Sequence, residues 1–357
     1  MFEDFSIESM HRTYHVSFTA CCPALESLYK EGDIVIVDEN ILNLYPPLES
    51  LLSNMSVVAV QANEQSKEYG PIGNVIEKIL ATGFSKNNRL IAVGGGVTQD
   101  ITAFISSILF RGVEWIFFPT NLLSQCDSCI GSKTSVNFGN YKNQLGGFWP
   151  PSHIYIDFEF LETLAESEIN SGIGEMLHYF LVDGSERIEQ LEHDISSALT
   201  VTETLRRLVY ESLSIKKKMV EVDELDKGPR NVFNYGHSFG HALESVTEHA
   251  VPHGIAVSFG MDLANVLSAR QGLIDMTLRN EIRPILERVW SKTILPIINI
   301  DDYLLALSKD KKNIGGEIKV ILTSGLGAMF KTTLSPTPEI IEFIDTYFRL
   351  QLYRENL

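Results

Sequence analysis

The sequence predicts an α/β protein in which a doubly wound α/β domain, residues 1–163, precedes a mostly α-helical domain, residues 164–357. Three observations predict this. Short runs rich in β-branched residues alternate with helix-like segments in the first half. Long amphipathic runs dominate the second half. The length of 357 residues suits two domains of roughly 150 residues or slightly more.

The first half contains six strand-like runs with helix-like segments between several of them. Strands that alternate with helices indicate a parallel, doubly wound sheet. The helical spacing is clearest over 69–81 and 98–110. The predicted strands are 14–18, 33–37, 56–60, 90–93, 115–118 and 154–157.

The second half changes character near residue 161, after the last predicted strand. Apolar residues then recur at helical spacing over long stretches, which predicts a domain built from helices. The predicted helices are 166–182, 196–222, 237–248 and 254–269.

Composition and charge exclude several classes of protein. The chain has 46 acidic and 29 basic residues, for a net charge of −17, whereas binding to nucleic acids or anionic membranes needs a basic face. Apolar runs break within about ten residues, well short of the roughly 20 that span a bilayer. The acidic start, residues 1–4, lacks the features of a signal peptide. We therefore expect a cytoplasmic globular protein that binds neither nucleic acid nor membrane.

Four cysteines are too few for a disulfide framework. Cys126 and Cys129 have the C-x-x-C spacing of redox and zinc sites, but a zinc ribbon needs a second such pair. The pair also falls in a predicted loop rather than at the start of a helix. Reduced, partly buried thiols are the preferred interpretation.

A triple glycine, Gly94, Gly95 and Gly96, lies between a predicted strand and a predicted helix. Glycines let backbone amides approach a pyrophosphate, and the helix N-terminus favours an anion. The spacing differs from G-x-G-x-x-G, so a tight turn is the simpler alternative. Polar residues that follow the second and third strands support a dinucleotide crevice, since each could bind a ribose hydroxyl. They are Asp38, Asn40, Glu64 and Lys67.

Metal-ligating residues gather in the second half. Glu175 and His178 share a helical face at i,i+3, and His237 and His241 share one at i,i+4. His253 opens the next element. A Glu with two His and an open fourth position is a catalytic zinc arrangement. A single helical His is more often structural, but this concentration favours a metal site.

Cations cluster near these segments on an otherwise acidic protein, which suggests recognition of a phosphate or carboxylate. Lysine runs can also be solvated helix faces, so Lys133 and Lys142, in a glycine-bearing loop, carry most weight. The candidates are Arg111, Lys133, Lys142, Lys216, Arg230, Lys311 and Lys312. The residues together indicate a nicotinamide-dependent metalloenzyme that acts on an anionic polyol.

Several segments together resemble the 3-dehydroquinate synthase and wider sugar phosphate cyclase family. They are GGGVTQD (94–100), FRGV (110–113), FPTNLLSQCD (118–127), KN (142–143), RNVFNYGHSFGHALE (230–244), HG (253–254) and DKK (310–312). The resemblance runs in order from about residue 30 to about 325. It implies an NAD-binding α/β domain, a helical metal-binding domain, an active site in the cleft between them, and a homodimer.

The resemblance also implies a role for each matching residue. Zinc or cobalt would be bound by Glu175, His237 and His253, with His241 handling protons beside it. The NAD site would add Asp100, Thr120 and Asn121 to the residues above. Sugar hydroxyls and phosphate would be bound by Asp127 and Lys133. The substrate carboxylate would be bound by Lys216 and Arg230. The phosphate site would comprise Arg111 from a dimer partner, Lys142, Asn143, Asn234, and Lys311 or Lys312.

The implied activity is that of a carbon–oxygen lyase acting on 3-deoxy-arabino-heptulosonate 7-phosphate through oxidation, elimination, reduction and aldol closure. Five positions depart from the family's usual residues and make another sugar phosphate an alternative: Ser132, Gln144, His178, Asp226 and Ile255. Arg230 favours a 2-keto acid substrate, because relatives whose substrates lack a carboxylate tend to lose it. A metal-dependent polyol dehydrogenase of similar build is a second alternative.

Overall fold

The computed structural model describes residues 2–139, 141–184, 188–199, 202–308 and 317–353. The chain folds into two compact units. The first comprises Met1–Leu164 and Lys216–Asp226, and the second comprises Ala165–Ile215 and Lys227–Leu357. The segment 216–226 thus belongs to the first unit, although the sequence assigned it to the second domain. Its side chains form ion pairs with Asp127 and Lys133 of the first unit, which accounts for the difference.

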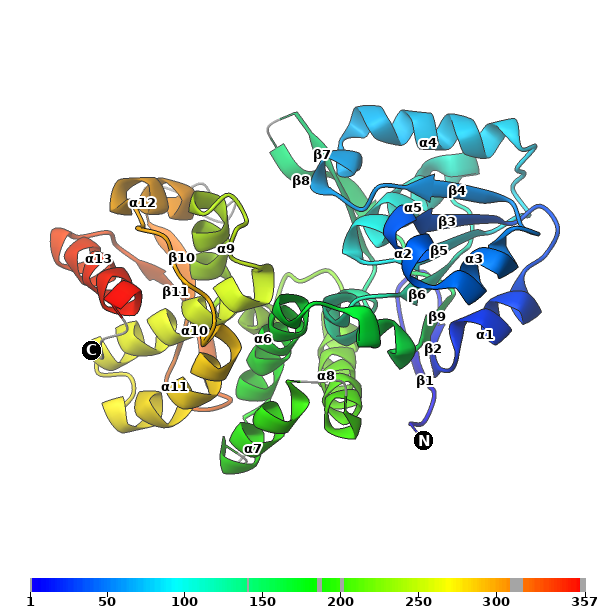
Figure 1. Cartoon of the computed structure of the whole chain (residues 1–357). Helices are drawn as coiled ribbons and strands as arrows, with labels where there is room; N and C mark the ends of the chain where they lie inside the picture. The colour runs from blue at the N-terminus through cyan, green and yellow to red at the C-terminus, as the bar shows by residue number, and fades with distance from the viewer. Residues whose placement is uncertain (1, 140, 185–187, 200–201, 309–316, 354–357) are drawn as a thin grey trace. The chain divides into compact units, whose positions relative to one another are not determined.

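The first unit is built on a seven-stranded sheet of order β1-β2-β9-β6-β5-β3-β4 (Figure 1). All neighbouring strands are parallel except β1 and β2. Central strands of such sheets are buried on both faces, and β3 and β5 are buried along their whole length. The strands are β1 (Phe5–Ile7), β2 (Tyr14–Phe18), β3 (Ile34–Asp38), β4 (Val57–Val60), β5 (Leu90–Gly94), β6 (Trp115–Pro119) and β9 (His153–Ile156).

Helices cover both faces of this sheet. On one face α1 (Cys21–Leu28), α2 (Glu39–Leu44) and α3 (Pro46–Leu52) share a buried core with alternate residues of the central strands, among them Val35, Val37 and Ile91. On the other face α5 (Gly96–Ile108) packs on β3, β5 and β6, and α4 (Tyr69–Ala81) packs on β4 and α5 (Figure 1). The predicted doubly wound α/β architecture is confirmed.

Short elements complete the first unit. The helical turns are η1 (Glu64–Lys67), η2 (Leu109–Arg111), η3 (Ser124–Ser128) and η4 (Phe158–Thr163). An antiparallel hairpin, β7 (Lys133–Phe138) and β8 (Tyr141–Phe148), contacts α5. The sequence did not predict this hairpin, because β8 is exposed along most of its length and lacks an apolar alternation.

The second unit is mostly helical, as predicted, with α10 at its centre. Every residue of α10 from Gly254 to Ser268 is buried, and the helix packs on α6, α9 and α11. The helices of this unit are α6 (Glu166–Asp183), α7 (Ile188–Ala198), the first part of α8 (Glu203–Val222), η5 (Pro229–Asn234), α9 (His237–Val246), α10 (His253–Arg270), α11 (Met276–Trp290), α12 (Ile300–Ser308) and α13 (Pro338–Tyr353). A hairpin of β10 (Ile318–Thr323) and β11 (Met329–Leu334) joins them. The helix predicted over 196–222 is wrong as a single element, since α7 ends at Ala198 and α8 begins at Glu203.

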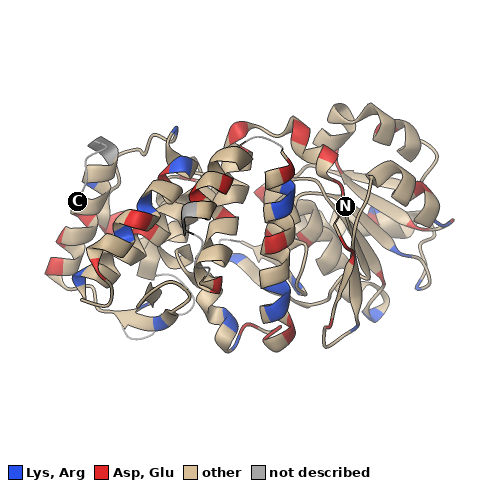
Figure 2. Ribbon diagram, turned by 90° about the horizontal axis from the view of Figure 1, so that it is seen from below, with Lys and Arg blue, Asp and Glu red and all other residues tan. Residues whose placement is uncertain are grey.

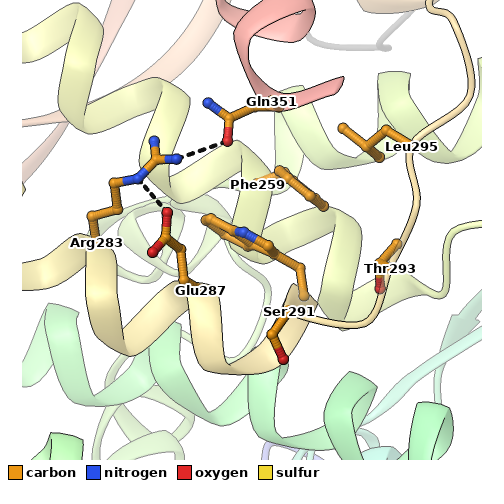
Figure 3. A pocket seen from close by; sticks show the side chains of 8 residues that line it. Phe259, Arg283, Glu287, Ser291, Thr293, Leu295 and Gln351 are labelled. Atoms are coloured by element: carbon orange, nitrogen blue, oxygen red, sulfur yellow. Dashed lines mark hydrogen bonds and ion pairs between the residues drawn. The ribbon is translucent and has the colours of Figure 1, made fainter. Parts of the chain in front are cut away.

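A cavity of about 300 Å³ lies among α10, α11, α13 and the segment after α11 (Figure 3). Phe259 and Trp290 stack in it with ring centroids 4.2 Å apart. Arg283 reaches it with its guanidinium already bonded to Glu287 and Gln351. None of the predicted site residues lines this cavity.

The distribution of charged residues and of apolar helices in the structure agrees with what the composition predicted. Acidic residues are spread over the helices and loops of both units, with Lys and Arg scattered among them (Figure 2). Among the residues that the structure describes, no helix has both the length and the apolar character needed to cross a bilayer.

Candidate functional site

Three helices of the second unit bring together the predicted metal ligands. Glu175 comes from α6, His237 from the first residue of α9, and His253 from the first residue of α10. Oε1 of Glu175 lies 3.3 Å from Nε2 of His237, and Oε2 lies 3.3 Å from Nε2 of His253. One ligand atom from each residue lies within 4.8 Å of the other two.

Close backbone packing makes this convergence possible. A side chain at Gly174 would clash with the carbonyl oxygen of Gly254, since its Cβ would lie 2.2 Å away. A Cβ on Gly254 would lie 1.7 Å from the carbonyl oxygen of Ser171. The Gly254 N–H donates to the Ser171 hydroxyl at 3.0 Å. The start of α10 therefore rests directly on α6, beside Glu175.

The donor set fits a divalent metal ion. A carboxylate and two imidazoles are the ligands of one class of catalytic zinc site, in which a fourth position stays open to water or substrate. Glu175 is only 3% exposed, and burying a carboxylate requires partners of opposite charge or a metal. Burial alone would raise its pKa, but His237, His178 and His253 hold the pKa well below the ordinary value.

His241 and His178 flank the three ligands. The His241 ring centroid is 5.5 Å from those of both His237 and His253. Desolvation and the charges of these two histidines lower the pKa of His241 to about 3. His178 is 1% exposed, and its Nδ1 lies 3.5 Å from Oε1 of Glu175. The predicted departure at His178 therefore touches the ligand set itself.

Two further predicted residues of the second unit lie in η5, the turn that precedes α9. Arg230 is buried, and the Nδ2 of Asn234 donates to the carbonyl of Asn231 at 3.0 Å. Ile255 is buried in α10 two residues after His253. Lys311 and Lys312 lie outside the described residues.

In the first unit the triple glycine forms the turn from β5 into α5. A Cβ on Gly94 would lie 2.5 Å from Cβ of Thr98, and one on Gly95 would lie 2.4 Å from Nδ2 of Asn121. Asn121 is fixed because its Oδ1 accepts a bond from the Ser124 N–H at 2.9 Å. A Cβ on Gly96 would meet no other atom of the described residues within 4 Å, so the space around the start of α5 is open. Backbone amides at this helix start can receive a phosphate.

Lys67 links predicted cofactor and phosphate residues. Its Nζ lies 2.7 Å from Oδ2 of Asp100 and donates to Oδ1 of Asn143 at 2.9 Å. Glu64, 3.8 Å from the same Nζ, also accepts a bond from Asn137 at 2.8 Å. Burial raises the pKa of Asp100, and this effect exceeds the lowering of the pKa by the charge of Lys67.

The other predicted cofactor residues follow two strand ends. Asp38 ends β3, and its Oδ1 accepts a bond from the Asn40 N–H at 2.9 Å, which caps α2. Burial raises the pKa of Asp38. Thr120 is buried directly after β6. In parallel sheets, ligands bind beyond the carboxyl ends of the strands, where these residues lie.

Two ion pairs hold the predicted substrate-binding lysines. Lys216 lies 2.7 Å from Oδ1 of Asp127, and its Nζ also donates to the Asp127 carbonyl at 2.6 Å. Lys133 lies 2.7 Å from Asp226, with 51% of its side chain exposed. Lys216 is buried, so its pair with Asp127 is the more rigid of the two.

Arg111 and its neighbour Phe110 have positive φ values of 66° and 49°. Such backbone is costly for non-glycine residues and occurs often at functional sites. Gly112 follows with φ 113°, under the ring of Trp149. Arg111 is exposed, and Lys142 and Gln144 are exposed on β8.

The two cysteines of the C-x-x-C pair are buried and form no disulfide with a described residue. They lie in and directly after the π-helical turn η3, so the loop predicted for them is wrong. Desolvation raises the pKa of Cys129 to about 12, which disfavours a reactive thiolate.

Sequence reasoning missed three residues of these clusters. Glu244 stands in the 230–244 segment without an assigned role, yet it contacts His253 at 3.0 Å. Its spacing from His241, i+3, was the available signal. Asn137, from the unpredicted hairpin, bonds to Glu64 and Asn143. Glu224 accepts bonds from Ser9 and Met10 of the N-terminal arm, residues 8–10, which follows β1. No local sequence pattern indicates this contact.

Comparison with solved structures defines the class of fold. A 2-deoxy-scyllo-inosose synthase complexed with carbaglucose-6-phosphate, NAD+ and Co2+ superposes with a TM-score of 0.86 at 24% identity, over 96% of this chain and all of that one. A 2-epi-5-epi-valiolone synthase from Streptomyces hygroscopicus subsp. jinggangensis 5008, with NAD+ and Zn2+ bound, gives 0.82 at 24% identity, over 96% and 97%. Glycerol dehydrogenase from Schizosaccharomyces pombe gives 0.59 at 16% identity, over 90% and 85%. The chain has the two-domain fold that these enzymes share.

Sequence comparison then gives the family. Residues 57–171 match the family described as 3-dehydroquinate synthase N-terminal, and residues 172–313 match its C-terminal counterpart. The 3-dehydroquinate synthase of Alkaliphilus metalliredigens (strain QYMF) is 33% identical over 319 residues, 88% of this chain and 89% of that protein. That of Sulfurovum sp. (strain NBC37-1) is 34% identical over 328 residues, 90% and 92%. This chain belongs to the 3-dehydroquinate synthase family, as the sequence motifs predicted.

Proposed function

We propose that this enzyme is an NAD- and metal-dependent sugar phosphate cyclase that converts 3-deoxy-arabino-heptulosonate 7-phosphate to 3-dehydroquinate and phosphate. The observation that carries the proposal is the Glu175, His237 and His253 cluster in a chain of this family. Relatives named 3-dehydroquinate synthase, about a third identical over most of the chain, support this substrate. Two structures of the same fold contain NAD+ with Co2+ or Zn2+, which supports these cofactors.

Residues of the second unit would act at the substrate hydroxyl that is oxidised. A divalent ion held by Glu175, His237 and His253 would supply Lewis acidity, while NAD accepts and later returns a hydride. We assign proton transfer at that hydroxyl to His241, one helical turn beyond His237. We assign the substrate phosphate to Asn234 in η5, together with Lys311 or Lys312. Arg230 in the same turn would pair with the substrate carboxylate.

Residues of the first unit would bind the cofactor and orient polar groups of the substrate. The glycine turn at the start of α5 would receive the NAD pyrophosphate, with Asp38 and Glu64 available to ribose hydroxyls. Lys133 is exposed enough to exchange its partner Asp226 for a hydroxyl or a phosphate oxygen. Lys216, fixed by Asp127, would present a buried positive charge to the substrate carboxylate.

A second candidate is a cyclase of the same mechanism that acts on another sugar phosphate, such as sedoheptulose 7-phosphate or glucose 6-phosphate. His178 favours it, because this buried side chain lies 3.5 Å from Glu175 at a position where the family resemblance implies a lysine. Histidine is shorter than lysine and titrates near neutrality. Arg230 favours the heptulosonate instead, since the other substrates have no carboxylate.

The two candidates can be separated by measuring phosphate release from all three sugar phosphates with NAD and zinc present. We expect the highest kcat/KM for the heptulosonate, and no release above background from the others. The His178→Lys variant should raise the rate on the heptulosonate, with Glu281→Gln on the exposed side of α11 as a control that leaves the rate unchanged. Preference for another sugar phosphate would overturn the substrate assignment and keep the cyclase.

We also propose a cytoplasmic homodimer in which Arg111 serves the partner's site. The positive φ values of Phe110 and Arg111 and the exposure of both residues support a role for this turn in contact with another molecule. Sedimentation at micromolar concentration should give twice the mass of the 40.0 kDa chain. A monomer with full activity would contradict the homodimer.

A further inference from the structure

We propose that Glu244 is a positioning residue for the metal centre, because its carboxylate fixes the ring of His253 with Nε2 facing the ion. The inference rests on the metal centre of the proposed function. It concerns a residue that would not itself bind the metal.

Glu244 lies on the face of α9 that carries both histidines of this helix. It follows His237 by seven residues and His241 by three, and both spacings place side chains on one helical face. Its Oε2 lies 3.0 Å from Nδ1 of His253. The opposite ring nitrogen, Nε2, lies 3.3 Å from Oε2 of Glu175.

This arrangement selects one tautomer of His253. When Nδ1 carries the proton and donates it to Glu244, the Nε2 lone pair points to the cluster of ligands. His237 is held in the same way, since its Nδ1 lies 3.2 Å from the carbonyl oxygen of Tyr235. Both imidazoles therefore present Nε2 to Glu175. A carboxylate is the stronger acceptor, so Glu244 should fix its ring more firmly than the Tyr235 carbonyl does.

The surroundings of Glu244 strengthen this bond. Its side chain is 12% exposed, so water competes little for the carboxylate oxygens. The other oxygen, Oε1, lies 3.9 Å from Nδ1 of His249, which is too far for a hydrogen bond. Of His249 and His253, only His253 is therefore within hydrogen-bond distance of Glu244.

A competing role for Glu244 can be stated from the same atoms. His241, Glu244 and His253 also lie close enough to hold an ion, with one ligand atom of each within 4.8 Å of the others. An ion bound there through Nδ1 of His253 would replace the hydrogen bond to Glu244. In that case Glu244 would be a ligand, and its loss would change the coordination of the metal.

The test is metal affinity in the full-length protein with Glu244→Gln and Glu244→Ala. Chelator competition should show a Zn2+ dissociation constant raised about 10- to 100-fold by alanine. Glutamine should raise it less, because its amide oxygen can still accept the Nδ1 proton. The absorption spectrum of the Co2+-loaded variants should keep its shape, since the ligand set is unchanged. Glu281→Gln, an equal loss of charge on the exposed side of α11, should match wild type.

Thermal unfolding of the metal-free variants identifies loss of fold, and the isosteric glutamine keeps the test valid if alanine unfolds the protein. Unchanged Zn2+ affinity in both variants would overturn this inference and leave the proposed function standing. A changed Co2+ spectrum would overturn it by making Glu244 a ligand. Wild type that binds neither ion would remove the metal centre of the proposed function, and this inference with it.

Discussion

At the residue scale, the most demanding position in the second unit is Asp262, a fully buried carboxylate on α10. Its oxygens accept from Arg279 at 2.9 and 3.0 Å and from Arg283 at 3.0 Å. The Tyr347 hydroxyl donates to it at 3.0 Å. Two arginines of α11 and a tyrosine of α13 thus converge on one charge of the central helix.

Removing that charge takes the acidic partner from the buried Arg279 and leaves Arg283 with Glu287 as its remaining acidic partner among the described residues. We predict that Asp262→Ala lowers the free energy of unfolding by about 3–5 kcal/mol, the usual cost of breaking a buried ion pair from one side. Urea unfolding measures this. The exposed Asp302→Ala should cost less than about 1 kcal/mol. A change of similar small size for Asp262→Ala would mean that this network contributes little to the fold.

Residue identities also show how far sequence reasoning reached into the site. Helical spacing drew attention to the pairs Glu175 with His178 and His237 with His241. The family resemblance then selected Glu175, His237 and His253 as the ligands. The partners of these ligands could not be selected, because a contact such as that of Glu244 with His253 depends on how separate helices pack. The same holds for the ion pair of Asp226 with Lys133. From sequence alone, a glutamate on an amphipathic helix is interpreted as a solvent-exposed side chain, because its neighbours in other elements are unknown.

At the element scale, the end of α8 and the residues that follow it are bonded to the N-terminal arm within the first unit. The Met10 N–H donates to Glu224 at 2.8 Å, the Ser9 hydroxyl donates to it at 2.6 Å, and the Glu8 N–H donates to Glu221 at 3.1 Å. The same part of the chain begins at Lys216 and ends at Asp226. The arm therefore stabilises the segment that carries Lys216, a proposed substrate-binding residue, and Asp226, the ion-pair partner of Lys133.

This contact predicts a pH dependence. Burial would raise the pKa of Glu224, but the hydrogen bonds from the Met10 N–H and the Ser9 hydroxyl outweigh burial and lower it. A carboxylate with a depressed folded-state pKa stabilises the protein above its unfolded-state pKa, near 4.5, and this stabilisation is lost as pH falls through the folded value. Glu224→Gln should therefore destabilise the protein at pH 6 to 7, with a deficit that shrinks below about pH 4.5.

Urea unfolding followed by tryptophan fluorescence between pH 3.5 and 7 measures this deficit. Glu26→Gln, an exposed glutamate of α1, is the matched control and should show no deficit at any pH. A deficit for Glu224→Gln that stays constant over this range would show that the carboxylate charge is not what holds the arm.

Elements were predicted from sequence with uneven success. Buried strands such as β3 and β5 were predicted from runs rich in apolar and β-branched residues, and helices such as α4 from helical spacing. Both kinds of prediction match the structure within one or two residues. The β7–β8 hairpin and the break between α7 and α8 do not, because neither is marked by an apolar pattern. The hairpin carries Lys133 and Asn143. The element that the sequence did not predict therefore contains two of the predicted site residues.

At the scale of the whole molecule, the fold and family are established, and the proposed activity would need chemistry from residues of each unit. A doubly wound sheet provides the glycine turn suited to a dinucleotide. A helical unit provides the Glu and His cluster suited to a divalent ion. Polyol dehydrogenases of similar fold would also use a nucleotide and a metal, so the distinguishing feature is what happens to the hydride.

The most direct measurement is therefore phosphate release from 3-deoxy-arabino-heptulosonate 7-phosphate, with catalytic NAD and zinc, while absorbance at the NADH band is followed. A cyclase returns the hydride within each cycle, so we predict many equivalents of phosphate per NAD and no accumulating NADH. NADH that rises steadily with turnover, without phosphate, would contradict the cyclase and indicate a dehydrogenase.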